Sequence, residues 1–498
     1  MLEQIELGKR LEKEEFKSMM DTLTVKLGEL QRKLRNYNIP VAILFEGWEA
    51  SGKGTLINHL IHPLDPRGFK VFTMEEKTEE EKWHSFFWAF WNQIPAKGRI
   101  HIYDHSWYHR MISEKIYKHP EDMEAMLDEF NLFEKQLTDD GVVLIKFFLH
   151  ISKKEQESRF EKLEKSEDTS WRVNKEDWKE NKKYHDYLEV LDRVLIQTDT
   201  PNAPWYVIEA TDKKYAIAKM FHTVIKQMSK ALDLAEHKTE KQKEQVENQD
   251  KPENFFENKF KPGVLKGIDL SVTMEKEKYK EKLEKLQDRL RILHNRMYRE
   301  RVPVIIALEG WDAAGKGGAI KRITENIDPR GYEVIPISAP NDLERQYHYL
   351  WRFWTKFPKA GHLEIFDRTW YGRVLVERVE GFATREQWSR AYNEINQMEE
   401  NLVQDGYIIL KFWLHISKEE QEKRFHEREN IVEKQWKITE EDWRNRSKWE
   451  QYEEAVDEMI VKTSTSKAPW VIVEADSKLY ARIKILETIV ETLENILK

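Results

Sequence analysis

The chain of 498 residues contains no cysteine, which excludes disulfides, zinc–thiolate sites and a cysteine nucleophile. It also has no apolar run of the roughly 20 residues that a membrane-spanning helix needs. The longest run, 142–151, includes Lys146 and His150 and is typical of a buried strand. Residues 1–17 are rich in Glu and Lys, so no signal peptide is expected. These absences predict a cytoplasmic protein without a membrane partner.

An excess of positive charge is missing as well. The 82 Lys and Arg residues are outnumbered by 90 Asp and Glu residues, giving a net charge of −8. A general attraction to nucleic acid is therefore not expected, and we predict no nucleic-acid partner. The 18 Trp and 22 Phe residues argue against global disorder, and the length favours two or three domains.

A glycine-rich loop with G-x4-G-K spacing is present twice, at 47–54 and 310–317. Each copy follows an apolar run, 41–45 or 304–308, as a loop between a strand and a helix requires. Its backbone N–H groups can surround a phosphate, the Lys can reach over it, and the following helix adds its dipole. The alternative is a tight glycine turn without a ligand, which leaves the Lys of both copies unexplained.

The two loops belong to a long internal repeat. An offset of 263 residues relates the loops and the segments up to Asp104 and Asp367, and an offset of 265 relates the Ala-Pro-Trp segments at 203–205 and 468–470. A repeat this long indicates a tandem domain duplication, because solenoid repeats are much shorter. We predict domains at 1–235 and 269–498, joined by a charged linker at 236–268.

Each copy predicts the same order of elements. An amphipathic helix (23–34 or 283–297) precedes the strand, the loop and its helix, and four further apolar strands alternate with helices. Their predicted ranges are 69–73, 100–104, 142–150 and 205–209 in the first copy, and 332–337, 363–367, 407–415 and 470–474 in the second. Nearly continuous apolar strands between helices predict an α/β fold, with a parallel five-stranded sheet covered on both faces in each domain.

The loop lacks the Ser or Thr that usually follows its Lys and binds Mg²⁺, because Gly54 and Gly317 stand there. Other oxygen ligands are needed, and Asp312 in the loop and Asp367 at the end of a strand are the candidates. The alternative for Asp312 is a turn-capping role.

Basic residues flank these carboxylates. Arg368 and Arg373 follow Asp367, at the strand ends where open α/β sheets bind ligands, so they are expected to face phosphates. The alternative, strongest for Arg373, is a structural ion pair. Lys434 and Lys437 lie in a charged segment that is interpreted as a lid over the phosphates, the alternative being a solvated helix.

Taken together, these motifs resemble the polyphosphate kinase 2 family in its fused two-domain form. The resemblance rests on EGWDAAGKGG at 309–318, DPRGY at 328–332, FDRTWYGR at 366–373, QWKITEEDW at 435–443 and APW at 468–470. It covers nearly the whole chain. It implies two tandem P-loop kinase-like domains with a helical lid, and Mg²⁺-dependent phosphoryl transfer between inorganic polyphosphate and a nucleotide, AMP being the acceptor associated with fused members. Mn²⁺ could replace Mg²⁺.

The resemblance also implies roles for individual residues. The implied catalytic residues are Asp312, Lys316, Asp367, Arg368 and Arg373, of which Asp312 and Asp367 would hold the metal. The implied phosphate- or nucleotide-binding residues are Gly310, Gly315, Gly317, Gly318, Asn341, Asp342, Lys434, Lys437 and Arg482.

The first copy departs from this pattern at several positions. Asp312 corresponds to Glu49, Arg368 to His105, Lys434 to Thr169 and Arg482 to Ile217. Three cationic groups are thus lost from a site that works by charge. We therefore predict that the second domain is catalytic, and that the first is structural or binds polyphosphate weakly.

Several alternatives stay open at this stage. ADP could be the acceptor instead of AMP, ATP could be the donor, or the chain could be a non-catalytic polyphosphate-binding protein. A homodimer is possible. The sequence does not decide base preference or the favoured direction.

Overall fold

The computed structural model describes residues 2–73, 77–113, 119–247, 263–430 and 440–497. The chain divides into two compact units. The first comprises residues 1–77, 93–253 and 342–348, and the second comprises 78–92, 254–341 and 349–498. The predicted linker begins as helix, because α9 (Lys213–Glu247) continues past residue 236.

The first unit contains a five-stranded sheet in which every paired strand is parallel. In spatial order the strands are β2 (Phe69–Thr73), β3 (Ile100–Asp104), β1 (Val41–Gly47), β4 (Val143–His150) and β5 (Trp205–Glu209). The central strand β1 is buried almost to its last residue, as its continuous apolar sequence predicts.

The second unit repeats this sheet. Its spatial order is β7 (Tyr332–Pro336), β8 (Leu363–Asp367), β6 (Val304–Gly310), β9 (Ile408–His415) and β10 (Trp470–Glu474). Leu308 of β6 is paired with Asp367 of β8, so the strand that leads into the loop ends beside the strand that carries Asp367. The predicted parallel five-stranded sheets are confirmed in both copies.

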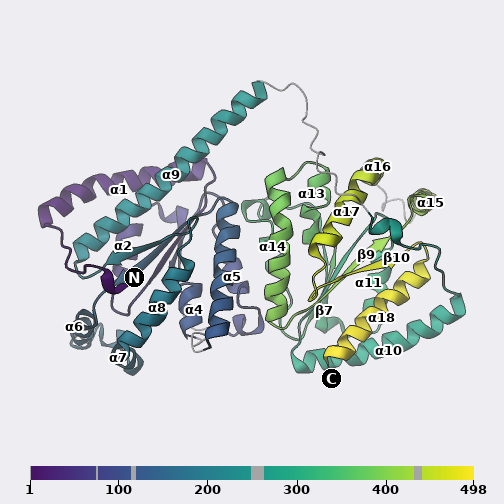
Figure 1. Ribbon diagram of the computed structural model, residues 1–498, viewed down its shortest axis with the longest axis horizontal. Coiled ribbons are helices and arrows are strands. Elements are labelled where there is room, and N and C mark those ends of the chain that lie inside the picture. The colour runs from purple at the N-terminus through teal and green to yellow at the C-terminus, as the bar shows by residue number, and fades with distance from the viewer. Residues whose placement is uncertain (1, 74–76, 114–118, 248–262, 431–439, 498) are drawn as a thin grey trace. The chain divides into compact units, whose positions relative to one another are not determined.

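Helices cover both faces of each sheet (Figure 1). In the first unit α1 (Lys13–Asn36) packs along α9 on one face, and α5 (Pro120–Asp139) packs with α8 (Tyr184–Thr198) on the other. In the second unit the corresponding pairs are α10 (Lys276–Glu300) with α18 (Lys478–Ile496), and α14 (Arg385–Gln404) with α17 (Trp449–Thr463).

Shorter helices complete the two units. They are α2 (Lys53–Ile61), α3 (Trp88–Trp91), α4 (Trp107–Ser113), α6 (Lys153–Glu164), α7 (Lys175–Lys182), α11 (Lys316–Thr324), α12 (Trp351–Trp354), α13 (Val376–Val379), α15 (Lys418–Glu429) and α16 (Glu440–Ser447). Across the described ranges, no helix combines the length and the apolar character needed to cross a membrane.

A buried ion pair supports each sheet from the side of α5 or α14. Lys411 of β9 lies 2.7 Å from Glu399 of α14, and its ammonium also donates to the Tyr371 hydroxyl and the Thr463 carbonyl. The first unit repeats the arrangement with Lys146 and Glu134. Since every donor of the ammonium has a partner, the buried charge is accommodated.

Candidate active site

The glycine-rich loop of the second unit connects β6 to α11, as predicted. Gly310 ends β6 with φ +148°, and a β-carbon there would lie 2.6 Å from the carbonyl oxygen of Leu414, so only glycine fits. Gly315 adopts φ +113° directly before α11, which again favours glycine. The turn therefore aims the N-terminus of α11, with its unpaired N–H groups, into the space beyond the sheet.

Lys316 lies over this loop. Its ammonium donates to the carbonyl of Gly310 at 2.8 Å and is 3.4 Å from the carbonyl of Trp311. The positive charge is therefore held at the place where the loop can surround a phosphate.

Asp312, in the loop, contacts residues of two other elements, the turn after β8 and α16. One of its carboxylate oxygens lies 3.3 Å from Nη2 of Arg368, which follows β8, and the other accepts from Asn445 of α16 at 3.1 Å. Its side chain is only 17% exposed, whereas that of Arg368 is 52% exposed. The structure thus brings two sequence-predicted residues together and leaves the guanidinium accessible to a ligand.

The backbone conformation at Arg368 is fixed by hydrogen bonds of the next residue to Glu309. Arg368 has φ +65°, a left-handed conformation that non-glycine residues adopt at a cost. The next residue, Thr369, donates from its N–H and its hydroxyl to Oε1 of buried Glu309, at 2.7 and 2.8 Å. Burial raises the pKa of Glu309, although Lys316 and Thr369 oppose the shift. Glu309 thereby ties the end of β6 to the turn that follows β8.

A buried arginine that sequence reasoning missed fixes the other side of the loop. Arg424 of α15 donates to the carbonyls of Ala313 and Ala314 at 3.0 Å. It also donates to the carbonyls of Ala475 and Asp476, which follow β10, at 2.7 and 2.9 Å. One guanidinium therefore joins the loop to the end of the edge strand. The available signal was its recurrence 265 residues from Arg159, which clamps the first loop in the same way.

The loop tryptophan has a similarly defined environment. The ring of Trp311 stacks on Trp449 with centroids 3.7 Å apart, and its indole N–H donates to Nδ1 of His415 at 3.0 Å. Burial lowers the pKa of His415 to about 4, so its imidazole is neutral at neutral pH, and the hydrogen bond from Trp311 assigns the unprotonated nitrogen to Nδ1. Trp48 makes the corresponding contacts with Tyr184 and His150.

Arg373 is placed differently from Arg368. Its guanidinium lies 3.1 Å from Glu377 and 4.3 Å from the ring centre of Tyr349, and its side chain is largely buried. These contacts are those of the structural alternative considered for this residue. A role for Arg373 toward phosphate stays a prediction.

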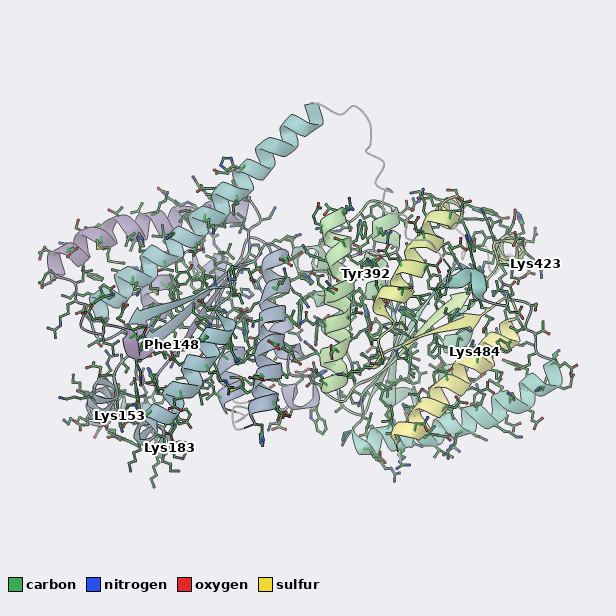
Figure 2. The ribbon with its side chains drawn as sticks, in the orientation of Figure 1. Phe148, Lys153, Lys183, Tyr392, Lys423 and Lys484 are labelled. Carbon is green, nitrogen blue, oxygen red and sulfur yellow. The ribbon has the colours of Figure 1, made fainter. Side chains whose placement is uncertain are left out.

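The remaining predicted residues are distributed around the loop and beyond it. Arg482 of α18 lies near the start of α11, because a β-carbon on Gly318 would be 3.1 Å from its Nη2. Lys484, on the same helix, binds Glu474 at the end of β10 and helps to fix α18 (Figure 2). A β-carbon on Gly317 would meet nothing within 4 Å, so the approach to α11 is open there.

Four further predicted residues have less structural support. Asp342 is almost fully exposed and pairs with Arg345 at 2.9 Å, in the segment grouped with the first unit, whereas Asn341 belongs to the second. Lys434 and Lys437 lie outside the described residues, so the predicted lid contacts stay predictions.

The corresponding site in the first unit keeps the scaffold and changes the charges. Lys53 donates to the carbonyl of Gly47 at 3.3 Å but is also 3.1 Å from the carboxylate of Glu49, so the loop lysine already has an anionic partner. The attraction of Lys53 lowers the pKa of Glu49 to about 2. Burial raises the pKa of Asp104, the counterpart of Asp367. A phosphate entering this loop would have to compete with Glu49 for Lys53.

The second site can therefore bind a polyanion at several points. It offers loop N–H groups, the ammonium of Lys316, the guanidinium of Arg368 beside Asp312 and that of Arg482 near the start of α11. Asp312 and Asp367 provide carboxylate oxygens, the donor type that Mg²⁺ prefers, so the residues fit that ion. Such an arrangement suits phosphoryl transfer, in which positioning and charge stabilisation supply most of the catalysis.

Comparison with known proteins gives consistent matches over the whole chain. A sequence profile of the polyphosphate kinase 2 family matches residues 10–236 and 273–498. The polyphosphate:AMP phosphotransferase of Pseudomonas aeruginosa is 39% identical over 498 residues, which are 99% of each chain. That of Acinetobacter johnsonii is 36% identical over 465 residues, 91% of each chain. A crystal structure described as a polyphosphate kinase 2 from Pseudomonas aeruginosa matches with a TM-score of 0.87 at 38% identity, covering 99% of both chains.

Proposed function

Because the chain belongs to the polyphosphate kinase 2 family, we propose that it transfers the terminal phosphoryl group of inorganic polyphosphate to AMP, giving ADP. The family resemblance drawn from the motifs of both halves is confirmed. The observation that carries the choice of AMP is the match, over nearly the full length, to relatives named polyphosphate:AMP phosphotransferase.

In the proposed reaction an oxygen of the AMP phosphate attacks the terminal phosphorus of the polyphosphate. The bond between that phosphorus and its bridging oxygen breaks, and the polymer is released one phosphate shorter. With a second pKa of about 6, the AMP phosphate is already ionised at neutral pH, so no general base is required. The main barrier is the repulsion between two polyanions.

The residues of the second unit are suited to lowering that repulsion. Lys316 and the N-terminus of α11 would hold the donor phosphates, and Arg368 and Arg482 would neutralise charge beside them. Asp312 and Asp367 would hold Mg²⁺, which when bound neutralises charge on the phosphate oxygens. Arg424 and Glu309 would act only as positioning residues, because they fix the loop and the turn after β8.

We assign catalysis to the second unit and a structural or weakly polyphosphate-binding role to the first. The support is electrostatic: His105 stands where Arg368 is, and Glu49 already neutralises Lys53. A cationic site that has lost a permanent charge binds a polyanion less well.

Product analysis with AMP, long-chain polyphosphate and Mg²⁺, in the absence of ATP, tests the proposal. We expect ADP from the wild-type chain, a loss of most activity in Asp367→Asn, and near-normal activity in the matched variant Asp104→Asn. Turnover of ADP instead of AMP, or a requirement for ATP, would replace the acceptor or the donor. No turnover with any pair would favour a non-catalytic polyphosphate-binding protein.

A further inference from the structure

Two imidazoles and a carboxylate converge beside the phosphate loop of the first unit. Glu46 at the end of β1, His105 after β3 and His109 on α4 each offer a ligand atom, and these atoms all lie within 4.8 Å of one another. The second unit has Arg368 and Gly372 in place of the two histidines, although Glu309 matches Glu46. Of the two copies, only the first therefore has the residues of this cluster.

Glu46 is held so that one oxygen remains available. Its Oε1 accepts from both the N–H and the hydroxyl of Ser106, each at 2.7 Å. Its Oε2 lies 3.6 Å from Nδ1 of His105. The side chain is only 9% exposed, so its position is set by the surrounding structure.

His105 is oriented as a metal-binding histidine usually is. Its buried Nδ1 makes no hydrogen bond, while the opposite ring nitrogen, Nε2, lies 3.5 Å from the carboxylate of Glu49. Histidines that bind a metal through one nitrogen commonly direct the other N–H to a carboxylate, which fixes the tautomer. The ring of His109 lies against that of His105, with centroids 3.8 Å apart.

One pair of ligand atoms is spaced nearly as in a small divalent-cation site, and the three ligand atoms lie within 4.8 Å of one another, a spread that a bound ion would have to narrow. Ligand bonds of about 2.05 Å in a tetrahedral site place neighbouring ligand atoms about 3.3 Å apart. The 3.6 Å between Glu46 and His105 is close to this value, and it is too long for a hydrogen bond. Two imidazoles with one carboxylate suit Zn²⁺ and similar borderline cations, whereas Mg²⁺ prefers oxygen ligands only.

We propose that His105, His109 and Glu46 form a binding site for one Zn²⁺-like divalent cation in the first unit, with Glu49 supporting His105. Three protein ligands leave a fourth position open, as in zinc sites that also bind water or an anion. The ion would restore positive charge where the second unit has Arg368. The proposal does not depend on which unit catalyses or on the nucleotide acceptor.

The test is titration of the full chain, freed of metal by a chelator, with Zn²⁺ in the presence of excess Mg²⁺. We expect one Zn²⁺ per chain in calorimetry, and a d–d absorption band typical of nitrogen ligands when Co²⁺ replaces Zn²⁺. The variant His105→Arg/His109→Gly carries the residues of the second unit. It should bind Zn²⁺ more than about 100-fold more weakly, since loss of a supporting residue alone typically costs about 10- to 100-fold.

Two further variants keep the test decisive. The control His59→Gln/His62→Gln removes two histidines outside the cluster and should bind Zn²⁺ like the wild type. Glu46→Gln keeps an acceptor for Ser106 but removes the charge, so it reports on the site even if the double variant fails to fold; it should bind Zn²⁺ at least about tenfold more weakly. No stoichiometric binding by the wild type, wild-type affinity in Glu46→Gln, or loss of binding in the His59/His62 control would each overturn the proposal.

Discussion

The substitution Arg424→Lys tests whether one buried guanidinium positions the phosphate loop. Arg424 donates to four carbonyls, two in the loop and two after β10, and its Nε donates to Glu420. A lysine keeps the charge but has a single nitrogen with three donors, so it cannot span both pairs of carbonyls. At least two buried carbonyls would lose their partner.

The expected cost follows from those two groups. An unpaired buried polar group costs about 1–3 kcal/mol, so Arg424→Lys should lower the free energy of unfolding by about 2–6 kcal/mol. The lower half of this range is expected, because the Asp476 carbonyl is only partly buried and can accept from water. The released loop should also misplace Lys316 and Asp312, and a displacement of about 1 Å can reduce kcat about 100-fold.

The duplicated chain provides a matched control. Arg159→Lys breaks the equivalent contacts with Ala50, Ser51, Ala210 and Thr211 in the first unit. Calorimetry should show comparable destabilisation in both variants, whereas ADP formation from AMP and polyphosphate should fall strongly only in Arg424→Lys. Equal loss of kcat in both variants, or normal kcat in a folded Arg424→Lys, would refute the reasoning.

Two further predictions concern groups around Asp312 and Trp311. Asn445 donates to Asp312 at 3.1 Å, and the residue at the corresponding position of the first unit is Glu180. A glutamate at position 445 would repel Asp312, so Asn445→Glu should lower kcat/KM at least about tenfold more than Asn445→Ala does. Equal kcat/KM values for the two variants in steady-state assays would contradict this. Burial lowers the pKa of His415 from 6.5 to about 4. As the pH falls, the unfolded chain therefore takes up this proton before the folded chain does. The contribution of the neutral imidazole to folding stability is fully present above about pH 6.5 and is lost as the pH falls toward 4. Between pH 7 and 5 this group should cost about 2 kcal/mol of stability, and urea unfolding of His415→Gln should show a smaller acid loss by that amount, whereas an unchanged loss would assign it to other groups.

The strand–loop–helix units could be predicted because their signals are local. An apolar run ending in Gly310, followed by Gly315 and Lys316, specifies a strand, a turn with positive φ and a helix start. The alternation of strands and helices gives parallel sheets, and the repeat gives two of them. The order of strands depends on long-range pairing, and no local pattern in the sequence states it.

Individual roles were harder to predict where the side chain acts across the fold. Arg424 lies in the segment KEEQEKRFHERE, whose composition is that of a solvated helix, yet its guanidinium is buried against two loops. Arg373 is the last residue of the motif at 366–373, but the turn directs it to Glu377 and Tyr349. Sequence adjacency gave the correct neighbourhood, and the direction of each side chain came only from the fold.

The two copies separate what the fold requires from what the chemistry requires. His105 and Arg368 share φ +65°, and Glu46 and Glu309 hold the next residue through the same pair of hydrogen bonds. Arg159 and Arg424 clamp both loops alike. Since these costly features are present in both units, they are needed to build the loop and the turn, whatever the unit binds. Side chains that face the loop differ between the copies, as at Arg368 and His105, although the backbone that presents these two residues has the same φ.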